Sequence, residues 1–230
     1  MIKKWTKSKN KKLSFDFSHP KLSQPSEKEI DEINLKIPHY GETLKGNIEY
    51  SKSYFEIIDI AKRISSGTGS YGTSRFYVLL KGKGKHKKDH HILDIKKQFK
   101  PCAFYHFSEK DKEDFLNQYN NQALRHHLVM NQLGKQNNDL SGWIELFGEY
   151  YSVRERSAYK EYFPTEKLNK KEEYKNLIKY WAEILACNHV SSYSEFDINY
   201  FKNFNKLQEK EFSNWLADIA LEYSQIVNYN

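Results

Sequence analysis

The sequence predicts an α+β fold in which an antiparallel sheet with one helix precedes a mainly helical region. Three observations support this class. Short apolar runs rich in β-branched and aromatic residues recur between residues 75 and 154 and are typical of hairpin strands. A helical pattern over residues 112–133 interrupts these runs. The last third of the chain then keeps helical spacing of its apolar residues over residues 177–185 and 212–226, which we interpret as core stripes.

The composition is that of a soluble globular protein with anionic partners. The 230 residues are 38% hydrophobic, 15% aromatic and 29% charged, enough for one large domain or two small lobes. The net charge of +7 favours nucleotides, nucleic acids or acidic surfaces without choosing among them. No apolar run approaches a membrane span and no apolar signal segment follows the basic start, so we expect a cytoplasmic protein without a membrane partner. Cys102 and Cys187 are interpreted as reduced, ordinary thiols.

The first elements follow from local patterns. Residues 1–25 are polar and rich in lysine, and we expect an extended basic arm there. Ser26 and Glu29 have the spacing of a capping box, which predicts a short helix ending near Ile37. Residues 54–63 carry apolar residues too densely to assign a period, and a helix that runs into the next strand is one interpretation.

A glycine-rich turn, Ser-Gly-Thr-Gly-Ser-Tyr-Gly, occupies residues 66–72. Glycines at this spacing let backbone N–H groups approach a phosphate. A dinucleotide-binding turn or a P-loop must open into a helix. Here the apolar run of residues 76–80 follows instead, so the glycines are expected to form the tip of a hairpin between two strands.

Lys96 ends the next apolar run, residues 92–96. Protein kinases cover the phosphates of ATP with a glycine-tipped hairpin and carry a phosphate-pairing lysine on the third strand. The sequence therefore predicts an ATP-type phosphate cradle, with magnesium as the accompanying ion and Lys96 as the counter-charge. Its expected members are Gly67, Gly69, Ser70, Gly72 and Lys96. A mobile loop and a solvated strand edge are the alternative interpretations of the two features taken singly.

The remaining elements complete the order. Residues 112–133 are expected to form one helix, and residues 143–147 and 150–154 form the clearest hairpin in the sequence. The expected organisation has three parts: a polar basic arm over residues 1–25, a sheet lobe with a leading helix over residues 26–156, and a helical portion over residues 157–230.

Positive charge is concentrated in residues 3–12 and in residues 81–88. The second segment is interpreted as a solvated hairpin tip. Its neighbours His86, His90 and His91 lack acidic or cysteine ligands to complete a set, so no metal site is assigned. Together with the many tyrosines, the two basic segments leave a second function open, a binding module for nucleic acid or an acidic surface without catalysis.

Several segments resemble the bacterial family of domains of unknown function numbered 2252. They are residues 59–64, 67–72, 79–80, 93–96, 151–155 and 185–189, with Arg75 and Gly82. The resemblance covers roughly residues 45–228. It implies a protein-kinase-like small lobe, an antiparallel sheet plus one helix, followed by a partial helical lobe, similar to aminoglycoside phosphotransferases. It also adds Arg154 and Glu155 to the expected nucleotide site, where a kinase-like hinge would begin; a buried arginine–carboxylate pair is the alternative.

The sequence departs from that family ahead of the glycine turn. Full-length members carry a Gly-Asp-x-His-x-x-Asn segment and a Phe-Asp-x-Asn-Asp-Phe-Asp segment, which would supply the catalytic and magnesium-binding acids. Neither precedes Gly67 here. The resemblance is thus to the C-terminal half of the family, as a fragment, a split gene product or a degenerate copy, possessing no assigned catalytic residue. A missing N-terminal half or a second copy is the expected protein partner, because a half-domain leaves apolar surface uncovered.

Five other residues have alternative interpretations. Asp197 and Asn199 lie in the one string similar to the absent motif, and a helix cap is preferred there over metal ligation. Glu113 and Asp114 are the nearest candidates for a carboxylate partner of Lys96. His189 matches a histidine of the family and is interpreted as a neutral core residue.

Overall fold

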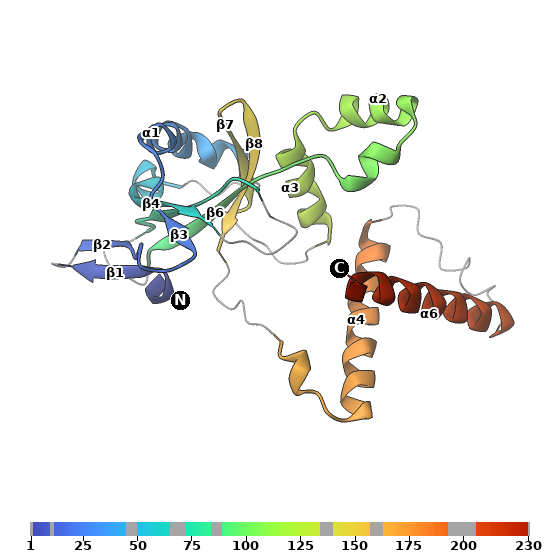
Figure 1. Cartoon of the computed structure of the whole chain (residues 1–230). Coiled ribbons are helices and arrows are strands. Elements are labelled where there is room, and N and C mark those ends of the chain that lie inside the picture. The colour runs from blue at the N-terminus through green and yellow to red at the C-terminus, as the bar shows by residue number, and fades with distance from the viewer. Residues whose placement is uncertain are drawn as a thin grey trace. The chain divides into compact units, whose positions relative to one another are not determined.

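The computed structural model describes the chain apart from residues 1, 10–11, 45–49, 65–71, 84–88, 134–139, 157–162, 193–205 and 230. It is a mixed α+β structure with antiparallel sheets, as the sequence predicts (Figure 1). The chain divides into two compact units, Met1–Glu173 and Tyr174–Asn230.

The first unit is built on a six-stranded sheet in which every neighbouring pair is antiparallel. In spatial order its strands are β3 (Leu22–Ser23), β4 (Ile57–Arg63), β5 (Arg75–Leu80), β6 (His91–Lys97), β8 (Glu149–Glu155) and β7 (Gly142–Leu146). The pairing of β4 with β5 confirms that the glycine-rich segment joins two strands. The pairing of β7 with β8 confirms the second predicted hairpin.

Residues 54–63 are not a helix that runs into a strand. A single 3-10 turn, η3 (Lys52–Phe55), precedes β4, which begins at Ile57. The apolar density of this segment has another cause, because side chains on both faces of β4 contribute to a hydrophobic cluster. Ile60 belongs to the cluster on one face and Ala61 to the cluster on the other. A strand covered on both faces has no polar side to mark its period.

One face of the sheet packs against the predicted leading helix, α1 (Glu27–Lys36), and the 3-10 helix η2 (Ile37–Thr43) that continues it. The capping box is formed as expected: the Glu29 N–H donates to Ser26 Oγ, and the Ser26 N–H donates to a Glu29 carboxylate oxygen. The helix buries Ile33 completely against the sheet cluster. Local capping and a single apolar face therefore fix α1 where the sequence places it.

Residues 1–25 are not an extended arm. They form the short helix η1 (Ile2–Lys4), the hairpin of β1 (Thr6–Lys9) and β2 (Lys12–Phe15), and the edge strand β3. Trp5, Phe15 and Leu22 are buried in a second cluster on the other face of the large sheet. The reason is the alternation of Leu13, Phe15 and Phe17 with polar residues, a strand period hidden among the lysines.

The segment between β6 and β7 contains two helices where one was expected. They are α2 (Glu109–Gln118) and α3 (Gln122–Leu133), preceded by the 3-10 helix η6 (Cys102–His106). Tyr119 leaves the helical conformation with φ of −132°, and Asn121 Oδ1 accepts the N–H of Leu124 as the cap of α3. The break lets α3 pack against β7 and β8.

The second unit contains α6 (Lys206–Tyr229) and most of α4 (Lys171–Ser192). Their apolar stripes, expected to be core, are largely exposed: Trp181 is 56% exposed and Trp215 is 57% exposed. The structure therefore does not show these stripes as core. His189, also expected in a core, is exposed. Across the described parts of the chain, no helix has both the length and the apolar character needed to cross a membrane.

Candidate functional site

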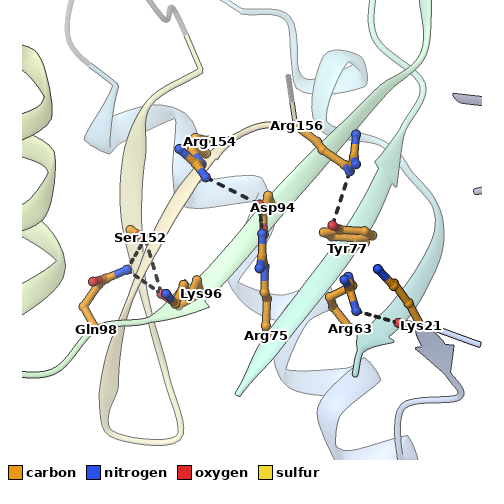
Figure 2. A network of polar contacts seen from close by, with 10 residues as sticks. All are labelled: Lys21, Arg63, Arg75, Tyr77, Asp94, Lys96, Gln98, Ser152, Arg154 and Arg156. Carbon is orange, nitrogen blue, oxygen red and sulfur yellow. Dashed lines mark hydrogen bonds and ion pairs between the residues drawn. The ribbon is translucent and has the colours of Figure 1, made fainter. Parts of the chain in front are cut away.

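Charged and polar side chains gather on one face of β5, β6 and β8 (Figure 2). It is the face that also carries the hydrophobic cluster of Trp5, Phe15 and Leu22. Residues paired across antiparallel strands point to the same face, so the register sets the side chains in rows. The first row consists of Arg75, Lys96 and Ser152. The second row consists of Tyr77, Asp94 and Arg154. We call these six residues the polar rows.

Asp94 is the central acid of the polar rows and is only 5% exposed. Arg75 donates to both of its carboxylate oxygens, from Nε at 2.6 Å and from Nη2 at 2.5 Å. This bidentate hydrogen bond raises the pKa of Arg75. The Arg154 Nη2 atom lies 4.0 Å from the same carboxylate. Two arginines therefore pair with one carboxylate, and with Lys96 in the adjacent row the polar rows carry three cationic side chains and one acid.

Neighbouring hydrogen bonds hold both ends of the polar rows. On one side, Gln98 Nε2 donates to Ser152 Oγ at 2.8 Å. On the other, Arg156 Nε donates to the Tyr77 hydroxyl at 3.2 Å, and its guanidinium lies 4.6 Å from the centre of the Trp5 ring. Ser152 and Tyr77, at opposite ends of the polar rows, are thus each held by a side chain from outside the rows.

The helix α3 brings His126 into the field of these cations. Burial is the largest cause that lowers the pKa of His126 to about 4, and the positive charges of Arg154, Arg125 and Lys96 lower it further, with a smaller effect from His127. His126 is therefore neutral near pH 7. Its surroundings are electropositive on both the α3 side and the sheet side.

This pKa predicts a loss of stability in mild acid. Because the pKa falls from 6.5 in the unfolded chain to about 4 in the fold, the unfolded state binds the proton first as the pH is lowered. We expect His126 to contribute an increasing loss of free energy of unfolding from about pH 6.5 down to about pH 4. Urea unfolding across this range should show a shallower decline in His126→Gln. The matched control is His106→Gln at an exposed histidine, and equal slopes in the two variants would contradict the assignment.

Two members of the predicted cradle, Gly72 and Lys96, lie among the described residues. Arg75, three residues after Gly72, pairs with Lys96 across β5 and β6, and the Lys97 N–H donates to the Ser74 carbonyl at 3.0 Å. The end of the glycine-rich segment therefore lies beside the Lys96 end of β6. Gly72 is exposed and has φ of +70°, a conformation that favours glycine. The three other members of the cradle, Gly67, Gly69 and Ser70, lie outside the described residues.

Arg154 and Glu155 do not form one site. Successive strand residues point to opposite faces of a sheet, so Arg154 belongs to the polar rows whereas Glu155 points to the other face. Glu155 Oε1 lies 2.6 Å from His91 Nδ1. Each residue thus has a different partner on a different face, and Arg154 is the one that shares a face with Lys96.

Sequence reasoning missed the acid that matters most. Glu113 and Asp114, the expected carboxylates near Lys96, are exposed on α2. The observed acid is Asp94, two residues before Lys96 and on the same face of β6. A charged residue between Leu93 and Ile95, inside an apolar run, was the available signal, because a buried charge needs a partner.

The residues that were weighed as metal ligands, and not assigned as such, divide into described and undescribed ones. Asp197, Asn199 and His86 lie outside the described residues. His90 Nδ1 lies 2.9 Å from the Lys81 carbonyl oxygen, and His91 pairs with Glu155. In the described portion of the chain, no three side chains of histidine, cysteine, aspartate or glutamate form a group that could hold a metal ion.

Comparison with protein families gives a match over nearly the whole chain. The family model described as "Uncharacterized protein conserved in bacteria (DUF2252)" matches residues 1–229. The match spans nearly the whole chain, so the expected limits of residues 45–228 are wrong at the N-terminal side, and a resemblance confined to a C-terminal half is corrected. The folded hairpin and β3 of residues 1–25 agree with this extent. No curated protein and no solved structure matches the chain.

Proposed function

The chain belongs to the DUF2252 family of bacterial proteins, and we propose that its sheet binds the phosphates of an ATP-type nucleotide. One observation carries the proposal: the polar rows hold three cationic side chains, Arg75, Lys96 and Arg154, against a single carboxylate, beside the end of the glycine-rich segment. Arginine and lysine side chains are the usual counter-charges for phosphates, and exposed backbone N–H groups of a glycine turn complete such sites.

We propose a kinase-like arrangement for this site. The element order supports it: a glycine hairpin, a strand that carries Lys96 next to its last residue, a helix packed against the sheet, and a second hairpin. In this arrangement Lys96 neutralises the phosphates, and magnesium enters with the nucleotide. The residues assigned here bind and orient the phosphates. No group among them is assigned to phosphoryl transfer, so the proposal fits part of a phosphotransferase or a degenerate copy acting in the cytoplasm, alone or with a partner chain.

The test is thermal unfolding with and without magnesium-ATP. A ligand that binds only the folded state stabilises it by about 2.7 kcal/mol at 100 times its dissociation constant. We expect a rise of several degrees in the wild-type midpoint that is lost in Lys96→Ala. Lys62→Ala is the matched control, because Lys62 is also a strand lysine but pairs with Glu29 near the other face. No rise in wild type at millimolar nucleotide would refute the proposal.

A specific observation also favours a second function, binding of nucleic acid. The lysines of η1 and of the N-terminal hairpin are on folded elements and face solvent: Lys3, Lys4, Lys7, Lys9 and Lys12 are all exposed. Binding by these lysines would weaken steeply as salt concentration rises and would not depend on Lys96. Titration of a fluorescent single-stranded oligonucleotide into wild type and Lys96→Ala therefore separates the two functions.

A further inference from the structure

The two arginines beside Asp94 are held in different ways. Arg75 makes two short hydrogen bonds to the carboxylate and its side chain is 15% exposed. Arg154 lies 4.0 Å from the same carboxylate, which is beyond hydrogen-bond distance, and its side chain is 46% exposed. Both carboxylate oxygens of Asp94 therefore accept from Arg75, whereas Arg154 is retained mainly by charge attraction.

Arg154 is also placed to share a ligand with Lys96. Ser152 pairs with Lys96 across β6 and β8, and Arg154 lies two residues further along β8 on the same face. Diagonal neighbours of this kind have Cα atoms about 7–8 Å apart, a span that two long side chains can close around one phosphate group. The planar fork of a guanidinium matches two phosphate oxygens at once.

We propose that Arg154 is the movable phosphate ligand of the site: it rests against Asp94 in the free chain and turns to make a bidentate contact with a phosphate of the bound nucleotide. Asp94 is then a positioning residue that keeps Arg75 in place and holds Arg154 near Lys96 until the ligand arrives. This inference rests on the proposed function and assigns one residue within it. The chemical class of the ligand is a polyphosphate.

The cationic residue that directly follows β8, Arg156, offers a matched control. Arg156 is two residues beyond Arg154, but its guanidinium is bound by the Tyr77 hydroxyl and lies against Trp5. Removing the charge of Arg156 weakens the long-range positive field about as much as removing the charge of Arg154. It leaves the Arg154 side chain in place. A difference between the two arginine variants therefore measures a direct contact and not general electrostatic attraction.

The experiment is calorimetric titration of inorganic triphosphate into the full-length chain. We expect Arg154→Gln to weaken binding by about 10- to 100-fold, the range for losing hydrogen bonds to a charged group, and Arg156→Gln to weaken it by less than about threefold. Arg154→Lys should not restore binding, because a lysine lacks the bidentate fork. Arg154→Met provides a second variant without the charge, and a thermal midpoint for each variant verifies folding.

The outcomes separate this inference from the proposed function. No binding of triphosphate to wild type would overturn both. Binding that is lost in Lys96→Ala but unchanged in Arg154→Gln would overturn the role of Arg154 and leave the proposed function standing. Equal losses in Arg154→Gln and Arg156→Gln would overturn the direct contact, because they would show that only net charge matters.

Discussion

Asp94→Ala is expected to lower the free energy of unfolding by about 3–5 kcal/mol, the cost of breaking a buried ion pair from one side. Asp94 is 5% exposed and accepts two hydrogen bonds from Arg75, whose side chain is 15% exposed. Without the carboxylate, the Arg75 guanidinium stays enclosed in the sheet face with its charge uncompensated. The destabilisation therefore comes from the arginine left behind more than from the lost attraction itself.

Urea unfolding of three variants tests this reasoning. The matched control is Glu56→Ala, which removes the acid of the Lys81–Glu56 pair; that pair is equally short, at 2.5 Å, but its side chains are 40% and 53% exposed. We expect this variant to lose no more than about 1 kcal/mol. The double variant Arg75→Met with Asp94→Leu should recover much of the loss, since it removes both charges and keeps apolar volume. A loss in Asp94→Ala no larger than in Glu56→Ala would show that Arg75 is not effectively desolvated.

The elements that the sequence predicts well are those specified by neighbouring residues. Ser26 and Glu29 cap α1 because both partners lie within one turn of the helix. The β7–β8 hairpin is set by strand residues on either side of Gly148, which has φ of +72°. The glycine-rich connection between β4 and β5 is recognisable for the same reason, because an apolar run directly follows it.

The candidate site was only partly predictable because its contacts depend on register. Lys96 could be chosen from its place at the end of an apolar run. Arg75 and Asp94 are 19 residues apart, and their contact exists only because β5 and β6 pair with Arg75 opposite Lys96. A shift of one residue in this pairing would send Asp94 to the other face. Strand register also decides that Arg154 lies on one face of the sheet and Glu155 on the other. No local sequence pattern shows which of the two shares a face with Lys96.

Trp5→Ala is the second substitution with a large expected effect, about 3–5 kcal/mol, which is typical of removing a fully packed aromatic side chain. Trp5 is 3% exposed and holds the N-terminal hairpin against the sheet face. Its ring meets Tyr77 edge-on at 5.2 Å between ring centroids and stacks on His19 at 4.5 Å. The Phe15 N–H adds a hydrogen bond to Asp59 Oδ2 at 2.7 Å, so the hairpin is attached at two points.

Chemical denaturation together with hydrogen exchange of the hairpin amides would check this prediction. Trp5→Phe should lower the free energy of unfolding less than Trp5→Ala does. Trp5 Nε1 is buried without an acceptor among the described residues, and phenylalanine removes that unsatisfied donor. Tyr105→Ala serves as the control, since Tyr105 is 72% exposed and its truncation should change stability by no more than about 0.5 kcal/mol.

The same substitution tests whether the hairpin supports the candidate site. Arg156 lies over Trp5 and donates to Tyr77, a member of the polar rows, so loss of the indole would remove one of the contacts that hold Arg156. We therefore expect faster exchange in the hairpin of Trp5→Ala and also in β5, which carries Tyr77. Faster exchange confined to residues 2–15 would show instead that the hairpin opens independently and that the polar rows hold without it.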